Sequence, residues 1–235
     1  MKVLEGFRVD PTHSDFPQAV TDNIEAFLPY RNEFIEFMFA AAPASDAELA
    51  RSLQRFFESI IPFMSRPESV SSWREWDFDN YVFIVHELFI YALAILLKRE
   101  RFETLADFLN LRFHMRDDTR HEDFMHSFSI VRKPMQALGP KQRELRRISL
   151  RADLLEQRSH TSGLKFVYVM AADFVLFLRS AILDANDHRA WYPETLLYSQ
   201  RIRDHSKYLR AQNRALISIK LHQWSLLRIG TSLKN

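Results

Sequence analysis

NYVFIVHELFIYALAILLKRERFETLADFLNLRF, residues 80–113, is the stretch that decides the fold of this chain. Its first part, Tyr81 to Leu97, is the longest strongly apolar run in the sequence. Apolar residues recur there at the i, i+3, i+4 spacing of a buried helical face, and the opposite face is apolar too. A helix that is apolar all round is either a membrane span or the centre of a large helical core.

Two observations favour the core helix. The run is short against the roughly 20 residues that a membrane span needs, and it contains His86 and Glu87. An ionised group in the middle of a bilayer is costly. We therefore predict no membrane span and interpret His86, Glu87 and Asp173 as buried polar residues with partners inside the protein, since buried polar groups nearly always have them. A catalytic role for His86 and Glu87 is the alternative.

The rest of the chain has the same helical character. Leu164 to Leu183 forms a second very apolar helix, in which Asp173 is the single acid, and residues 141–157 predict a helix with Leu145 and Ile148 facing inward and its arginines facing mostly outward. Alternating apolar and polar runs typical of strands are not evident. We predict an all-α fold, a compact bundle of about seven to nine helices without a significant sheet.

Three regions are expected along the chain. Residues 1–20 contain two prolines and no periodicity, and predict an N-terminal arm. Residues 21–198 form the helical bundle, with a possible division into two lobes near the irregular segment 114–140. Residues 199–235 form a basic C-terminal helical tail.

Composition excludes several classes of protein. The chain has no cysteine, which rules out disulfides, Cys-based zinc sites and a thiol nucleophile. Its four glycines lie too far apart for a glycine-rich phosphate loop. We expect no cofactor. The first residues show no apolar signal segment, and the expected location is the cytoplasm.

Charge is unevenly distributed. The whole chain carries 32 Lys and Arg against 30 Asp and Glu, a net charge of +2. Residues 199–235 contain eight of those cations and one acid, so the tail carries +7 and the remainder −5. An acidic body with a basic tail suggests a binding partner for the tail.

Several stretches resemble an all-helical family of uncharacterised bacterial proteins. They are HELFIYALAILLKRERFETL, RRISLRADLLEQRSHTSG, ADFVLFLRS and WYPETLLY, and the resemblance covers about residues 30–198. It implies an all-helical fold. It supplies no activity and no site residues, and it ends near the start of the basic tail.

One motif points to catalysis. Arg116 followed by His121 resembles the R-x4-6-H motif of HEPN ribonucleases, which are all-α, usually dimeric and independent of metals. The resemblance implies that Arg116 would bind the scissile phosphate and that His121 would transfer a proton. The alternative is a charged, solvated connector. His121 and His126 are five residues apart, about 140° on a helix, so we predict no metal site there.

Basic residues supply the remaining candidates. Cations neutralise phosphates or contact acidic protein surfaces. The candidates are Arg143, Arg146, Arg147, Arg151, Arg201, Arg203, Lys207, Arg210 and Arg214.

We therefore expect a non-catalytic, cytosolic accessory or interaction subunit of a bacterial complex, which binds a protein partner or a second copy of itself. A HEPN-like metal-independent ribonuclease, of toxin or phage-defence type, is the first alternative. A nucleic-acid-binding helical protein that uses the basic 141–151 and 201–228 faces is the second.

Overall fold

Helix α5 (Asp79–Lys98) lies at the centre of the protein. The computed structural model describes residues 2–41, 45–67, 72–117, 122–183 and 191–201. Every residue from Asp79 to Leu97 is buried. By length and composition the helical stretch Glu75–Lys98 is apolar enough to cross a membrane, yet its whole apolar window is buried within the protein. The all-round apolar pattern therefore marks a core helix.

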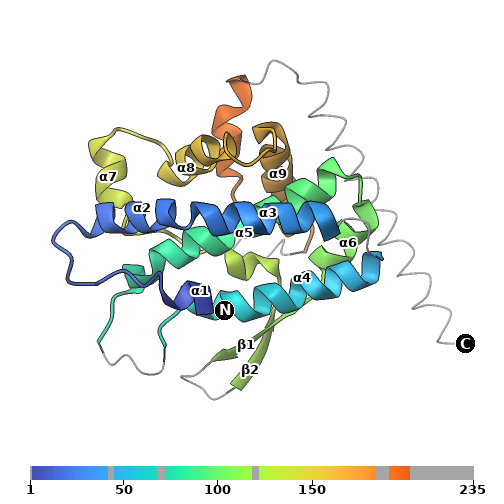
Figure 1. The fold of residues 1–235 in the computed structure, drawn as a ribbon, viewed down its shortest axis with the longest axis horizontal. Coiled ribbons are helices and arrows are strands. Elements are labelled where there is room, and N and C mark those ends of the chain that lie inside the picture. Colours follow the sequence, from blue (N-terminus) through green and yellow to red (C-terminus); the bar gives the residue numbers. More distant parts are fainter. Residues whose placement is uncertain (1, 42–44, 68–71, 118–121, 184–190, 202–235) are drawn as a thin grey trace, which may run out of the picture.

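Other helices surround α5 (Figure 1). Helix α9 (Phe166–Leu183) packs along it, and α2 (Phe16–Ala26) and α3 (Leu28–Ala41) run almost end to end across another side. Helices α4 (Asp46–Ile60) and α6 (Phe102–Asn110) pack on each other and on α5. The remaining elements are α1 (Lys2–Glu5), α7 (Gly139–Glu144), α8 (Leu150–Ser159), and the 3-10 helices η1 (Ile61–Met64), η2 (Glu75–Phe78), η3 (Phe128–Val131) and η4 (Glu194–Arg201). Nine α-helices occur in the described ranges, which confirms the all-α bundle.

A short hairpin lies within the segment expected to be irregular. Strand β1 (Phe113–Asp117) pairs antiparallel with β2 (Glu122–His126), and Phe113 lies opposite His126. The sequence showed no strand here because five-residue strands rich in charge lack a readable alternation. Phe113 is buried and anchors β1 to the core. This pair of strands is too small to change the fold class.

The expected N-terminal arm is part of the folded body. Leu4, Val9 and Phe16 are buried in the main hydrophobic core. Helix α2 begins at Phe16, earlier than expected, because the Asp15 side chain accepts a hydrogen bond from the Gln18 backbone N–H. An Asp at this position satisfies an otherwise unpaired amide of the first turn. Scattered apolar residues without periodicity can thus still join a core.

The expected helix over residues 141–157 is two helices, α7 and α8. Arg146 separates them with a φ of 50°, in the left-handed region that β-carbon crowding disfavours. Ser149 then caps α8 by accepting from the Ala152 backbone N–H. Because the chain turns at Arg146, the helical phase before it no longer predicts which residues after it face inward.

Candidate interaction site

Three side chains on the two sides of the break at Arg146 have the opposite orientation to the one expected. Leu145 is 51% exposed and Ile148 is 78% exposed, although both were expected to face inward. Arg151 was expected mostly outward and is buried, with its guanidinium donating to the Lys133 backbone carbonyl. At the turn between α7 and α8, apolar side chains are therefore exposed and the Arg151 side chain is buried.

A hollow of about 350 Å³ lies beside this turn. Three cations, Arg132, Lys133 and Arg151, line it together with one carboxylate, Glu194. Arg132 forms an ion pair with Glu194 at 2.8 Å, and the Ser149 hydroxyl also bonds to that carboxylate. We call this feature the cationic hollow. Three positive groups against one negative group leave it with a net positive charge.

Apolar side chains surround the cationic hollow. Ile148, Tyr192 and Leu197 line it, and Tyr192 and Leu197 are 60% and 42% exposed. The Arg132 guanidinium lies 5.9 Å from the centre of the Tyr192 ring, within cation–π range. Exposed apolar groups next to cations form a surface that a partner with acidic and apolar groups would match.

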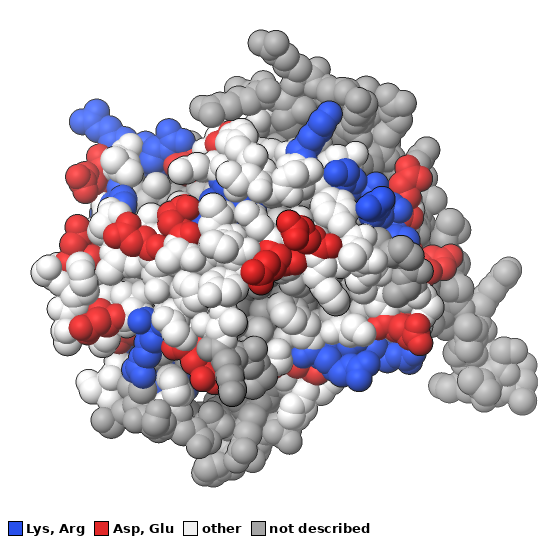
Figure 2. Space-filling model, viewed as in Figure 1, with Lys and Arg blue, Asp and Glu red and all other residues white. Residues whose placement is uncertain are grey.

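Two of the four predicted basic residues of this region extend the surface. The side chains of Arg143 and Arg146 are exposed and form no hydrogen bond or ion pair within the described residues. Arg147 instead holds Asp153 with two hydrogen bonds of 2.6 and 2.8 Å. Figure 2 shows the basic side chains gathered at the α7 corner, at the upper left. Arg143 and Arg146 are thus open to a partner.

The neighbouring side of the protein has the opposite charge. Helices α2 and α3 carry the acids Asp22, Glu25, Glu33 and Glu36, and their single cation, Arg31, is fully buried. Figure 2 shows red side chains along this side. The exposed side of α2 and α3 is therefore acidic, and this local excess of acids does not depend on the basic tail.

Beneath the cationic hollow, buried ionisable groups hold the core together. Asp173 accepts hydrogen bonds from the Trp191 indole and from the backbone and hydroxyl of Thr195. His86 stacks on Trp191 with ring centres 5.2 Å apart. Burial holds the pKa of His86 well below its usual range, which favours the neutral form of the ring. Both side chains position Trp191 and the start of η4.

Asp79 joins the start of α5 to the loop before α7. Its carboxylate accepts from the Ala137 backbone N–H at 2.7 Å. Burial raises the pKa of Asp79 to about 6. Burial disfavours a charged carboxylate, and the backbone N–H groups of Ala137 and Gln136 together with the Arg151 charge only partly offset this effect.

Glu87 forms a buried ion pair with Arg158. Two hydrogen bonds of 2.8 and 2.9 Å join them, and the side chains are 0% and 1% exposed. The guanidinium also donates to the Ile24 carbonyl and faces Glu25 at 3.3 Å. Sequence reasoning identified Glu87 but missed Arg158, although its spacing from Leu154 and Leu155 places it on the inward face of α8.

Most other sequence candidates stay predictions. Arg116 lies on β1, a strand rather than a helix, and His121 lies outside the described residues. Arg201 ends η4, and the further tail candidates Arg203, Lys207, Arg210 and Arg214 lie outside the described residues. Within the described ranges no group of three His, Asp or Glu side chains could hold a metal ion.

The cationic hollow itself was missed by sequence reasoning. Its lining comes from residues 132–135, 148–151 and 192–197, which only the fold brings together. The Arg132-Lys133 pair and Tyr192 were the available signals, and neither pointed to a site alone. No protein-family model, curated protein or solved structure matches this chain. A function for this chain is therefore argued from the geometry of its surface.

Proposed function

We propose that this chain is a non-catalytic, cytosolic interaction subunit, of a bacterial complex as its resemblance implies, that binds an acidic partner protein. The binding surface is the cationic hollow with the α7–α8 turn. The observation that carries the proposal is the exposure of Ile148, at 78%, on the turn that also carries Arg146 and follows Arg143, two exposed cations whose side chains have no partner within the described residues. A large aliphatic side chain in water gains when a partner covers it.

Charge complementarity identifies the occupant as an acidic segment with at least one apolar side chain. The apolar group would cover Ile148 and Tyr192, and carboxylates would meet Arg143, Arg146 and the hollow. The strongly perturbed buried groups, Asp173 among them, already serve packing, which supports a binding role over a catalytic one. Nothing comparable favours the ribonuclease.

The experiment combines capture with surface variants. The wild-type protein and Ile148→Asp would be used as bait in a host lysate, and a captured protein would be purified and its affinity measured at two salt concentrations. We expect Ile148→Asp to weaken binding at least tenfold, since a buried central anchor carries much of the binding energy. The double variant Arg143→Glu with Arg146→Glu should also weaken the binding, and the loss of affinity should be larger at the lower salt concentration.

The matched control is Phe37→Asp. Phe37 is 62% exposed but lies on α3, on the acidic side. It should leave the affinity unchanged. Equal losses in both variants, or an interaction that does not respond to Ile148→Asp, would reject the surface. Self-association that Ile148→Asp abolishes would show that the occupant is a second copy, and would overturn the proposal of a separate partner.

A further inference from the structure

A second cavity, independent of the cationic hollow, lies between α1, η1 and the start of α5. Its volume is about 580 Å³. Pockets of roughly 300–1,000 Å³ accommodate small organic ligands. We call it the aromatic pocket; its lining includes Phe63, Phe78, Tyr81, Arg8, Arg66 and Glu58.

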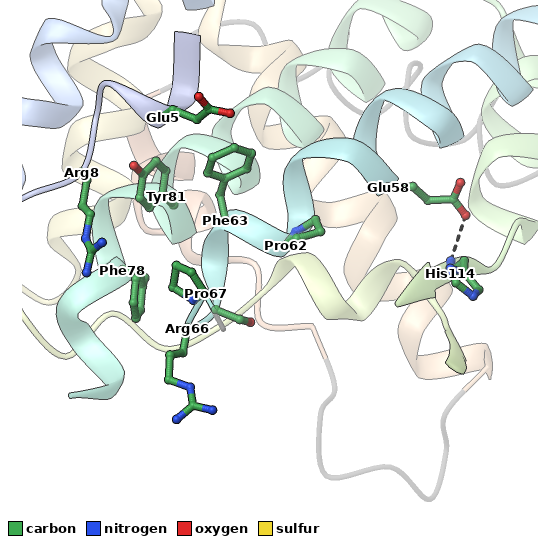
Figure 3. A pocket seen from close by; sticks show the side chains of 11 residues that line it. Glu5, Arg8, Glu58, Pro62, Phe63, Arg66, Pro67, Phe78, Tyr81 and His114 are labelled. Carbon is green, nitrogen blue, oxygen red and sulfur yellow. Dashed lines mark hydrogen bonds between the residues drawn. The ribbon is translucent and has the colours of Figure 1, made fainter. Parts of the chain in front are cut away.

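The middle of the aromatic pocket is apolar and firmly held. Figure 3 shows Phe63, Phe78 and Tyr81 together, with Pro62 and Pro67 beside them. The Tyr81 hydroxyl donates to the Leu4 carbonyl at 3.0 Å, which fixes the ring against α1. The Phe63 and Tyr81 ring centres are 5.5 Å apart. These rings form a preformed apolar surface for the body of a ligand.

One end of the pocket carries two unpaired cations. In Figure 3 Arg8 lies to the left of Tyr81 and Phe78, and Arg66 lies below Phe78 and Pro67, both away from Glu58. Neither forms a hydrogen bond or an ion pair with the described part of the chain; Arg66 lies over the Trp73 ring at 6.0 Å. An arginine holds a carboxylate with two parallel hydrogen bonds, so this end suits an anionic head group.

The other end has the opposite character. Glu58 accepts from the His114 backbone N–H at 2.8 Å, and both residues lie across the rings from Arg8 and Arg66 (Figure 3). A second anionic group at this end would face the Glu58 carboxylate. Glu5, drawn above Phe63 and Tyr81 in Figure 3, is a second acid of the lining, so a ligand with one anionic end fits this charge distribution better than a ligand with two.

We infer that the aromatic pocket binds an apolar monocarboxylate, with its carboxylate at Arg8 and Arg66 and its hydrocarbon body on Phe63, Phe78 and Tyr81. The inference does not depend on the proposed interaction surface. It adds a small-molecule site to a protein whose other surface is suited to a macromolecule.

Decanoate is a suitable probe. Isothermal titration calorimetry with the full chain, at a low concentration of decanoate, would measure its affinity and stoichiometry. We expect one molecule per chain. Sebacate, the dicarboxylate of the same length, should bind at least tenfold more weakly, and so should decylammonium. Equal binding of decanoate and decylammonium, or no binding of decanoate up to millimolar concentration, would overturn the inference.

Variants locate the site. Arg8→Gln with Arg66→Gln should weaken decanoate binding at least tenfold, since both charged donors are lost. Arg51→Gln, an exposed arginine on α4, is the matched control and should leave the affinity unchanged. Phe63→Ser should also weaken binding, with circular dichroism confirming that the variant is folded. An unchanged affinity in the folded double arginine variant would reject the pocket as the site.

Discussion

The buried pair of Glu87 and Arg158 gives the sharpest test of the fold. Both side chains are shielded from water, and the bond lengths are those of a charge-assisted pair. Replacing only one partner leaves a buried charge without its counterion, which costs about 3–5 kcal/mol. Replacing both with apolar residues of similar size removes both charges together and is far less harmful.

The structure allows the magnitudes to be worked out. In Glu87→Leu the guanidinium keeps the Ile24 carbonyl and the partly exposed Glu25, so the loss in unfolding free energy should lie near the low end, ~3 kcal/mol. Arg158→Met should lose more, ~5 kcal/mol, because Glu87 stays buried without the donor of both its hydrogen bonds. The double variant loses mainly the bond to the Ile24 carbonyl and the contact with the partly exposed Glu25, about 2 kcal/mol. The coupling energy is then ~6 kcal/mol.

Urea denaturation followed by far-UV circular dichroism would measure all four proteins, with equal m-values as the check for comparable unfolding. The control cycle uses Arg147→Gln and Asp153→Asn. That pair is equally short but its side chains are 44% and 23% exposed, so water screens it and the coupling should be much smaller. A double variant as unstable as the sum of the single variants would refute the reasoning.

Three further predictions concern the groups around the cationic hollow. Asp79→Asn should stabilise the protein by up to about 3 kcal/mol above pH 6 and should have no such effect below pH 4. The pKa of Asp79 is about 6 in the folded state against the usual 3.8, so ionisation of the carboxyl group destabilises the folded state increasingly from pH 4 to pH 6. Urea titrations across that pH range would measure the difference. Arg146→Gly should raise the unfolding free energy by about 1 kcal/mol, because glycine adopts a positive φ without strain, whereas Arg146→Ala should not. Asp173→Ala removes the acceptor of three hydrogen bonds and should cost about 3 kcal/mol or more, with Trp191 fluorescence shifted to longer wavelength; an unshifted spectrum would contradict the assigned contact.

The sequence by itself determined the all-helical fold and the central place of α5. Hydrophobic periodicity is a local property, and a run that is apolar on every side has to be covered by other helices. The same argument predicted α9 and the burial of polar groups within both helices. Their partners could not be read from it, because Glu87 and Arg158 are 71 positions apart.

Only the tertiary structure decided which residues face the solvent around the cationic hollow. One residue, Arg146, adopts a left-handed conformation and resets the helical phase, so Ile148 points outward and Arg151 inward. A periodic pattern does not reveal such a turn, since arginine has no preference for it. The hollow and the aromatic pocket likewise join segments that are distant in the chain, and packing brings them together.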